Sequence, residues 1–444
     1  MKKYRFLPVL LLFALVCHAQ QTGFKFDFGT GKAKKGYTKV TPETVYNPKT
    51  GYGFASGAAV KAVSNGGTAI TSDYITSKDP FSFSVKLPEG NYDVKVLLGD
   101  TKGTSATTVR AESRRLMLEN VKTKKGETVE KMFTVHIRDS IIRDSKGNAV
   151  GKTRIKPRER QNKHWDDMLT IEFNDSLPKI CAVEIIPNKT AATIFLAGDS
   201  TVIDQGEDPW ASWGQMFPVF LVPGKVAVAN YAESGETLKA FAGEKRFEKI
   251  FSMAKPGDYL FIEFTHNDQK PGGNHLDPYT TFKETLKKWI DEAKKRDMTP
   301  VLVTSTQRRK FDAAGHIENT LLEYPEAMRQ TAKEENVALI DLSAMSKTLY
   351  ETLGEKGSVN AFVHYPANTF PNQNKALEDN THFNMYGAYE LSKCVISSIR
   401  KQNLSLSKFV RKDVIDYNPE KPLPFEQFYW PKSGSVNVVK PDGN

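Results

Sequence analysis

The spacing of apolar residues changes near residue 190, and this change is the strongest constraint on the fold. Before it, apolar and polar residues alternate with a period of two, as in the run from Phe81 to Leu87. After it, short apolar runs such as TIFLA (193–197) and YLFIEF (259–264) alternate with segments of helical periodicity. Period two is typical of strands with one buried face, and the second pattern is typical of parallel strands joined by helices. The sequence therefore predicts two domains of different fold class.

The first half contains several more short runs of strand type, at 132–137, 168–173 and 182–186, and no convincing amphipathic helix. A Pro-Glu-Gly-Asn turn at 88–91 separates two of its alternating runs, as expected for a hairpin. We therefore predict an all-β sandwich of jelly-roll-like topology over residues 20–190. Carbohydrate binding is a candidate role for such a domain.

The second half predicts an α/β/α three-layer domain with a parallel sheet over residues 191–403. Helices are expected at 282–293, 324–335 and 385–400, between or after the apolar runs. In sheets of this kind, reactive residues lie at the carboxyl ends of the strands. The remaining segment, 404–444, is rich in Pro, Lys and aromatic residues, and we expect an irregular extension that wraps a surface.

The first 19 residues have the pattern of a secretory signal peptide. Lys2, Lys3 and Arg5 precede an apolar stretch at 6–16, and a small residue at Ala19 favours cleavage there. The stretch is too short for an ordinary membrane span, and no other segment is long and apolar enough. We therefore expect an exported protein, periplasmic or secreted, with no membrane span.

The chain is basic, with a formal net charge of +10 and a pI near 9.1. Nucleic acid is an unsuitable partner for an exported chain that has no nucleic-acid-binding motif, whereas an acidic polymer fits the charge. Eight Lys and Arg residues lie between 143 and 163, where they form either a solvated loop or a surface for a polyanion. Cys181 and Cys394 are far apart in sequence, and we expect two buried thiols rather than a disulfide.

Candidate catalytic residues follow the predicted strands. Ser200 comes directly after the first strand, within Gly-Asp-Ser-Thr, and the next two strands are followed by Gly235 and Asn267. Asp379 and His382 stand three residues apart before the last helix, so that one short loop can hold both. Any one of these features alone is weak, but their order along the chain predicts a single site.

The residue types match the needs of acyl transfer. A serine hydroxyl becomes a useful nucleophile when a histidine removes its proton, and a carboxylate can fix the orientation of that imidazole. Backbone amides of Ser200 and Gly235 and the side-chain amide of Asn267 could stabilise the negative charge of the tetrahedral intermediate.

In this order along the chain, the sequence segments around these residues resemble those of the SGNH (GDSL) hydrolase superfamily and, more closely, those of the rhamnogalacturonan acetylesterases. The resemblance implies Ser200 as nucleophile, His382 as general base and acid, Asp379 as orienting carboxylate, and Ser200, Gly235 and Asn267 as the oxyanion hole. It also implies removal of acetyl groups from pectin without metal or cofactor. The segments that carry the likeness, over about 193–402, are GDSTV, WGQM, THND, RRKFD, YPEAMR and DNTHFNMYGAY.

Two positions depart from the family pattern. Thr265 stands where a glycine is usual before His-Asn-Asp, and Glu236 follows Gly235 where a basic residue is common. Neither change removes a candidate catalytic group. The two departures therefore bear on the identity of the substrate more than on the type of reaction.

Substrate contacts are less constrained by the sequence. His266 either contacts substrate or braces its loop, and Arg308 and Arg309 either bind a galacturonate carboxylate or belong to a solvated loop. The acidic residues at 204, 207 and 208 lack the spacing of a metal site, and we predict no metal.

The sequence thus predicts a monomeric serine esterase that deacetylates an acidic pectic polysaccharide, chiefly rhamnogalacturonan. The alternatives are an esterase for another acetylated glycan or for pectin methyl esters, and a noncatalytic polysaccharide-binding protein. We also expect the second domain, without residues 20–190, to keep turnover of a small aryl ester.

Overall fold

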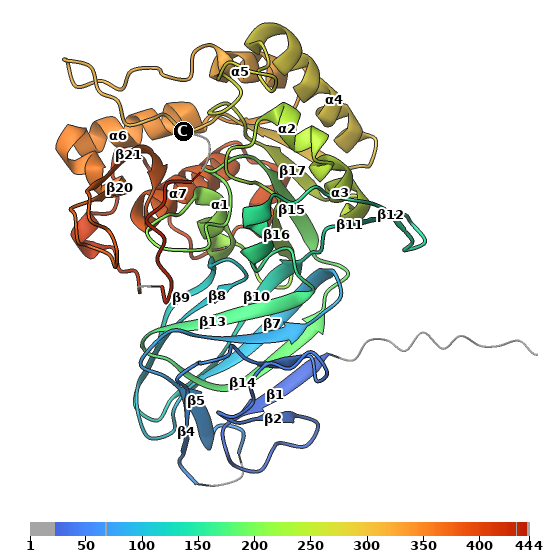
Figure 1. Cartoon of the computed structure of the whole chain (residues 1–444), viewed down its shortest axis with the longest axis vertical. Coiled ribbons are helices and arrows are strands. Elements are labelled where there is room, and N and C mark those ends of the chain that lie inside the picture. The colour runs from blue at the N-terminus through green and yellow to red at the C-terminus, as the bar shows by residue number, and fades with distance from the viewer. Residues whose placement is uncertain (1–22, 67–68, 432, 442–444) are drawn as a thin grey trace, which may run out of the picture.

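The computed structural model describes residues 23–66, 69–431 and 433–441 of the chain. The predicted signal peptide lies outside the described residues, so export stays a prediction. Figure 1 shows a strand-rich domain formed by the first part of the chain and a domain of mixed helices and strands formed by the rest. The two fold classes predicted from the sequence are confirmed.

The N-terminal domain is a sandwich of two mainly antiparallel sheets. Strand β14 pairs antiparallel with β7 on one side and with β1 on the other, whereas β1 and β2 are parallel. The first sheet contains β10 (Thr128–Ile137), β7 (Gly90–Gly99), β14 (Lys179–Pro187), β1 (Phe24–Phe28), β2 (Thr38–Val40), β5 (Asp73–Thr76) and β4 (Lys61–Ser64). The second contains β3 (Tyr52–Phe54), β6 (Phe81–Lys86), β13 (Met168–Leu177), β8 (Ser105–Ala111) and β9 (Arg115–Thr123).

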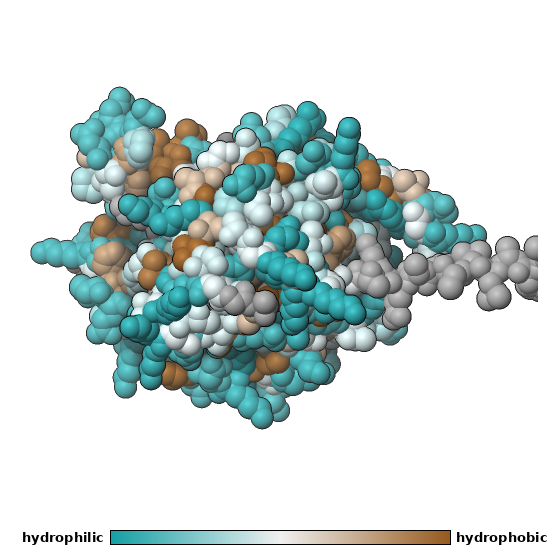
Figure 2. All heavy atoms as spheres, turned by 90° about the horizontal axis from the view of Figure 1, so that it is seen from below, coloured by the Kyte–Doolittle hydropathy of each residue, from teal (hydrophilic) through white to brown (hydrophobic). Residues whose placement is uncertain are grey.

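Alternation along the strands places one set of side chains in the core between these sheets. In β6, Phe81, Phe83 and Val85 are buried while the intervening serines are partly exposed. Phe83 packs against Phe26 and Phe28 of the opposite sheet, with ring centroids 5.0 Å apart in each pair. The far end of this domain is largely hydrophilic, with apolar atoms scattered among polar ones (Figure 2).

The second domain is built on a five-stranded sheet in which every neighbouring pair is parallel. The strand order is β16 (Val226–Asn230), β15 (Ala192–Ala197), β17 (Tyr259–Ile262), β18 (Thr299–Val303) and β19 (Ala338–Ile340). The chain therefore reverses its direction of travel across the sheet between β15 and β17. In doubly wound sheets, ligands bind outside the carboxyl ends of the strands at such a switch point.

Helices cover both faces of this sheet, as three-layer packing requires. Ile194 and Leu196 of β15 join a core with α1, α6 and α7, whereas Phe195 and Ala197 join a core with α2 to α5. The helices predicted at 324–335 and 385–400 are confirmed with small shifts at their ends. The α-helices of the second domain, in the described residues, are α1 (Trp213–Met216), α2 (Leu238–Gly243), α3 (Arg246–Met253), α4 (Lys283–Lys294), α5 (Tyr324–Glu334), α6 (Leu342–Ser358) and α7 (Met385–Lys401).

Smaller elements complete the domain and the tail. Strands β20 (Phe362–Tyr365) and β21 (Leu377–Phe383) form an antiparallel pair, and the segment after α7 has isolated bridges from Val410 to Leu221 and from Val436 to Asp208. The C-terminal segment thus returns over the surface of the second domain, as Figure 1 shows. The short turns are η2 (Phe217–Phe220), η3 (Pro278–Phe282), η4 (Val359–Ala361), η5 (Ser405–Phe409) and η6 (Phe425–Gln427).

The two domains share a polar interface. Arg114, in the turn between β8 and β9, and Arg115, the first residue of β9, have buried side chains that pair with Asp208 and Asp204 of the second domain. A second bridge is the hairpin of β11 (Ile141–Arg143) and β12 (Ala149–Lys152) with the following turn η1 (Pro157–Gln161), which lies against the second domain beside α3. The domain limits of 190 and 403 stay predictions, although β14 ends at Pro187 and β15 begins at Ala192.

Cys181 and Cys394 are buried free thiols, as expected. In the described part of the chain, no helix is long and apolar enough to cross a membrane. Among the same residues, no cluster of His, Cys, Asp or Glu has the arrangement of a metal site.

Candidate active site

Ser200 lies just beyond the carboxyl end of β15, at the switch point of the parallel sheet. The turn that places it depends on Gly198. A Cβ atom at that position would lie 2.6 Å from Val202 Cγ2 and 3.1 Å from the carbonyl oxygen of Glu263, so the chain can make this close approach only with glycine. The serine is 2% exposed, which keeps bulk water away from its hydroxyl.

A chain of two hydrogen-bonding contacts connects Ser200 to a buried carboxylate. The Oγ atom of Ser200 lies 2.9 Å from Nε2 of His382, and Nδ1 of His382 lies 2.9 Å from Oδ2 of Asp379. His382 and Asp379 are 1% and 4% exposed. The predicted residues therefore meet in the order that general-base activation of a serine requires.

The local backbone of β21 explains how residues three apart can face each other. We expected Asp379 and His382 in a short loop, but both belong to β21, where the pairing with β20 is irregular. The other carboxylate oxygen, Oδ1, accepts hydrogen bonds from the backbone N–H groups of Thr381 and His382, at 2.7 and 2.8 Å. This turn-like closure brings the imidazole onto the carboxylate.

Asp379 is held in its ionised form. Burial by itself raises the pKa of this carboxyl, but the hydrogen bond and charge of His382, with two backbone N–H groups, hold the pKa well below its usual range. An ionised Asp379 favours the tautomer of His382 that carries its proton on Nδ1, leaving Nε2 free to accept the serine proton.

Two further side chains border this group. The ring of Trp210 meets His382 edge to face, with centroids 5.7 Å apart and an interplanar angle of 88°. Nζ of Lys440, from the C-terminal tail, lies 3.4 Å from Oδ2 of Asp379. The tail therefore reaches the carboxylate from the solvent side, a contact that no sequence pattern predicts.

The three predicted oxyanion donors follow adjacent strands. Gly235 follows β16 with φ +75°, and Asn267 follows β17. Nδ2 of Asn267 donates to the carbonyl of Glu236 at 3.0 Å, and Oδ1 accepts from Nζ of Lys270 at 3.0 Å, which fixes the orientation of the amide. Within the described residues, the backbone N–H groups of Ser200 and Gly235 donate to no protein acceptor. They are thus available to an oxyanion.

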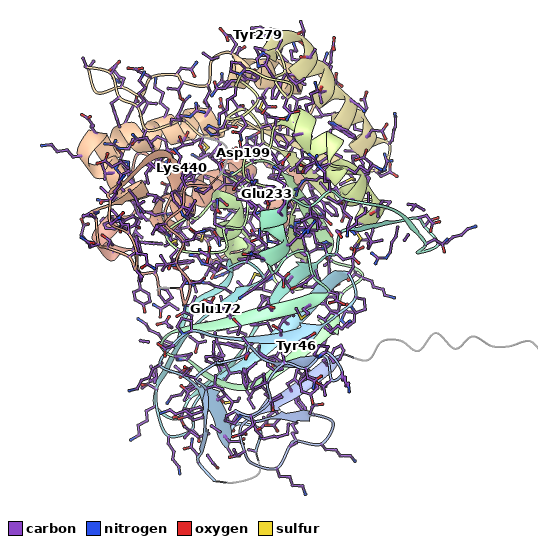
Figure 3. The ribbon with its side chains drawn as sticks, in the orientation of Figure 1. Tyr46, Glu172, Asp199, Glu233, Tyr279 and Lys440 are labelled. Atoms are coloured by element: carbon purple, nitrogen blue, oxygen red, sulfur yellow. The ribbon has the colours of Figure 1, made fainter. Side chains whose placement is uncertain are left out.

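Two clefts border the site. One, of about 560 Å³, lies where both domains and the tail meet, and its walls include Glu172, Trp210, Glu233 and Lys440. Figure 3 shows Glu172 on the sandwich and Glu233 and Lys440 on the second domain. The other cleft, of about 450 Å³, includes Gly235 and Asn267 in its walls. A substrate much larger than an acetyl group could therefore lie against both domains.

Of the three predicted substrate-binding residues, His266 is buried, and Arg308 and Arg309 hydrogen-bond to neighbouring segments. His266 is 1% exposed, and burial lowers its pKa well below the usual value, so its ring is neutral. Arg308 donates to the carbonyls of Thr320 and His266, at 3.0 and 3.3 Å, and Arg309 donates to Asn380 Oδ1 at 3.1 Å. Contact of these three with substrate stays a prediction.

Sequence reasoning missed the role of the basic segment at 143–163. Lys156 pairs with Glu236, Arg158 Nε lies 3.0 Å from Glu233 Oε1, and both glutamates flank the loop of Gly235. The acidic Glu236, a departure from the family pattern, thus has a basic partner supplied by the other domain. The one sequence signal for this pairing is that the first segment is basic, whereas the loop of Gly235 carries two glutamates.

The buried carboxyl of Asp268, beside Asn267, provides a test of how burial shifts a pKa next to this site. Its side chain is buried, Oδ1 accepts from the N–H of Leu238 at 2.8 Å, and burial raises its pKa to about 8. Folding therefore favours the protonated form, and the stability that it contributes is lost as pH rises from about 4 through 8. We expect Asp268→Asn to raise the melting temperature by roughly 5 °C at pH 9 and not at pH 5.

The measurement is thermal unfolding across this pH range, with Asp291→Asn on the exposed face of α4 as the control. If the melting temperature of Asp268→Asn changes with pH in parallel with that of the wild-type protein, the raised pKa of Asp268 is contradicted.

A serine, a histidine and a carboxylate in contact at the carboxyl edge of a doubly wound sheet, with amide donors beside the serine, define a hydrolase of carboxylic esters. Comparison with known proteins agrees with this class. Residues 196–388 match the family described as GDSL-like Lipase/Acylhydrolase, and residues 24–142 match that described as Beta-agarase/YXIM esterase-like, galactose-binding domain-like.

The chain is 46% identical over 220 residues to the rhamnogalacturonan acetylesterase RhgT of Bacillus subtilis (strain 168), covering 49% of this chain and 94% of that protein. It is 26% identical over 400 residues to the uncharacterized esterase YxiM of the same organism, covering 87% of this chain and 93% of that protein. The crystal structure of YxiM superposes with a TM-score of 0.47 at 24% identity, over 86% of this chain and 99% of that one. The chain belongs to the GDSL (SGNH) acylhydrolase family, with the rhamnogalacturonan acetylesterases among its homologues, and it is a carboxylic ester hydrolase.

Proposed function

We propose that this esterase removes acetyl groups from acetylated rhamnogalacturonan, using Ser200, His382 and Asp379. The observation that carries the mechanism is the unbroken chain of contacts from Ser200 Oγ through His382 to Asp379. The likeness to RhgT over the second domain supports the substrate. The signal-like segment at 1–19 supports a place outside the cytoplasm, where such polymers occur.

In the first half of the reaction, Ser200 Oγ attacks the acetyl carbonyl carbon while its proton passes to Nε2 of His382. The carbonyl oxygen becomes an oxyanion, which the N–H groups of Ser200 and Gly235 and the amide of Asn267 stabilise. When the intermediate collapses, His382 returns the proton to the departing sugar oxygen, and an acetyl-serine remains.

In the second half, a water molecule gives a proton to His382 and attacks the acetyl-serine. Collapse of this intermediate releases acetate and returns the proton to Ser200 Oγ. The ionised Asp379 stabilises the imidazolium in both halves. The charge of Asp379 therefore has to persist through the working pH range, and its lowered pKa provides for this.

The substrate is tested by measuring acetate and methanol side by side from acetylated rhamnogalacturonan, homogalacturonan and xylan. We expect kcat/KM for acetate release from rhamnogalacturonan to exceed that from xylan by about 10-fold or more, since about 1.4 kcal/mol of differential binding is enough. Release of acetate chiefly from xylan, or release of methanol in place of acetate, would overturn the proposal that acetylated rhamnogalacturonan is the substrate. Binding of polymer without release of either product would favour a noncatalytic role.

A further inference from the structure

The peptide between Ser234 and Gly235 carries one of the oxyanion donors, and its other end is held by the N-terminal domain. Arg158 donates through Nη2 to the carbonyl oxygen of Ser234, and Lys156 Nζ approaches the same oxygen at 3.4 Å. Ser234 itself is 5% exposed. Two cations from the sandwich thus meet one carbonyl of the catalytic loop.

The geometry of a peptide bond makes this contact relevant to catalysis. The carbonyl of Ser234 and the N–H of Gly235 belong to one planar trans unit, in which the two groups point in opposite directions. A cation that fixes the carbonyl therefore fixes the direction of the N–H. It also polarises the amide, which makes the N–H a stronger donor to an anion.

Glycine at 235 makes such external support necessary. Its φ of +75° lies in a region that glycine enters freely, and glycine also adopts many other conformations at little cost. An oxyanion donor acts best when it is already oriented before the reaction. The loop therefore needs a partner that selects one orientation of this peptide.

The two cations are themselves anchored. Arg158 is paired with Glu233 at 3.0 Å and Lys156 with Glu236, so each glutamate beside the glycine binds one of them. Directly after Arg158 in sequence, Glu159 is fully buried, and its Oε2 lies 2.6 Å from Nη2 of Arg246 in α3. The turn η1 is thus fastened to the catalytic domain at three adjacent points.

We propose that Arg158 and Lys156 are positioning residues for the oxyanion hole, which is thereby completed by the N-terminal domain. The proposal rests on the proposed role of Gly235 in that hole. Neither side chain touches the reacting atoms, and both act through the Ser234–Gly235 peptide. The sandwich then has a part in the chemical step itself, apart from any binding of polymer.

The test is the turnover of a small neutral ester, 4-nitrophenyl acetate, by Arg158→Ala, Arg158→Lys and Lys156→Gln. We expect Arg158→Ala to lower kcat by about 10- to 100-fold, less than the 10²- to 10³-fold effect of removing an oxyanion donor outright. KM should change by less than about 2-fold, since the ester has no charge for Arg158 to bind. Arg158→Lys should recover most of the lost rate, and Lys156→Gln should lose less than Arg158→Ala because its contact is longer.

Arg160→Ala is the matched control, because its exposed side chain belongs to the same turn. Each variant is melted first, and rates are compared well below its melting temperature. An unchanged kcat for folded Arg158→Ala, or a rise in KM confined to acidic polymer, would overturn the proposal and make Arg158 a structural or a substrate-binding residue. Should Arg158→Ala not fold, Arg158→Gln takes its place, and an unchanged kcat in both folded Arg158→Gln and Lys156→Gln would overturn the proposal equally. Failure of the wild-type protein to hydrolyse the ester would instead overturn the proposed function.

Discussion

Replacement of Ser200 by alanine is expected to lower kcat on 4-nitrophenyl acetate by at least about 10⁴-fold. Removal of a serine nucleophile eliminates the acyl-enzyme route, and only the slow attack of water in a polarised site remains. The effect should fall on kcat, because Ser200 Oγ contacts His382, whereas the two clefts that border the site are lined by other residues. The measurement is initial rate against ester concentration.

Ser176→Ala is the control, since Ser176 is an exposed serine at the far end of β13. Both variants should melt at the wild-type temperature within about 2 °C, because exchange of one hydroxyl for hydrogen creates no large cavity. Turnover by Ser200→Ala within tenfold of the wild-type protein would remove Ser200 from the mechanism.

The second large effect is expected at the domain interface, where Arg115→Ala should lower the free energy of unfolding by about 3–5 kcal/mol. Arg115 and Asp204 are each 1% exposed, and Nε and Nη2 of the arginine lie 2.9 and 2.8 Å from Asp204 Oδ2. Nη1 of Arg115 also donates to the carbonyl of Val228 at 3.1 Å. Without the guanidinium, the amide of Asn230 is the one hydrogen-bond donor to the buried Asp204 carboxylate that remains among the described residues.

Denaturant unfolding of the intact chain measures this effect. The double variant Arg115→Met with Asp204→Asn should recover part of the loss, because it leaves no unpaired charge buried. Lys86→Ala is the control, since Lys86 and Asp167 form an ion pair on the exposed surface of the sandwich, and its unfolding midpoint should match the wild-type value. A loss for Arg115→Ala no larger than that of the control would show that this interface does not stabilise the chain.

The interface also changes what we expect of the isolated second domain. Sequence reasoning treats residues 20–190 as separable, with turnover of a small ester kept after their removal. In the structure, that deletion would strip Arg115 from Asp204, Arg158 from Glu233 and Lys156 from Glu236. Since several carboxylates would then lose their partners at once, we now expect a destabilised domain with an impaired oxyanion hole.

The positions of Ser200, Gly235 and Asn267 at one edge of the sheet could be predicted from the sequence, because each follows a strand that is easy to recognise. TIFLA and YLFIEF are short, apolar and rich in β-branched or aromatic residues, and Ser200 and Asn267 come directly after them. Once the strands are known to be parallel, their carboxyl ends must share one edge of the sheet. The contact between His382 and Ser200, 182 positions apart, does not follow from that rule, because His382 lies in β21, which pairs antiparallel with β20 outside the parallel sheet.

The supporting residues could not be predicted in the same way. Lys156 and Arg158 lie in a segment that has the composition of a solvated loop, and Lys440 lies in a tail without periodicity. Their partners, Glu236, Glu233 and Asp379, are distant in sequence and belong to another domain or another element. No local pattern encodes a pairing between two such segments.

By itself, therefore, the sequence determined the two fold classes, the apolar strands of the parallel sheet, the helices near 282–293, 324–335 and 385–400, and the order of the candidate catalytic residues along the chain. These features depend on the periodicity of burial along each element, which is local. The tertiary structure alone decided that the sandwich and the tail reach the active site and that Glu236 has a basic partner. Ion pairs between domains depend on how two surfaces dock, and docking is fixed by the summed packing of both cores and not by the residues near either partner.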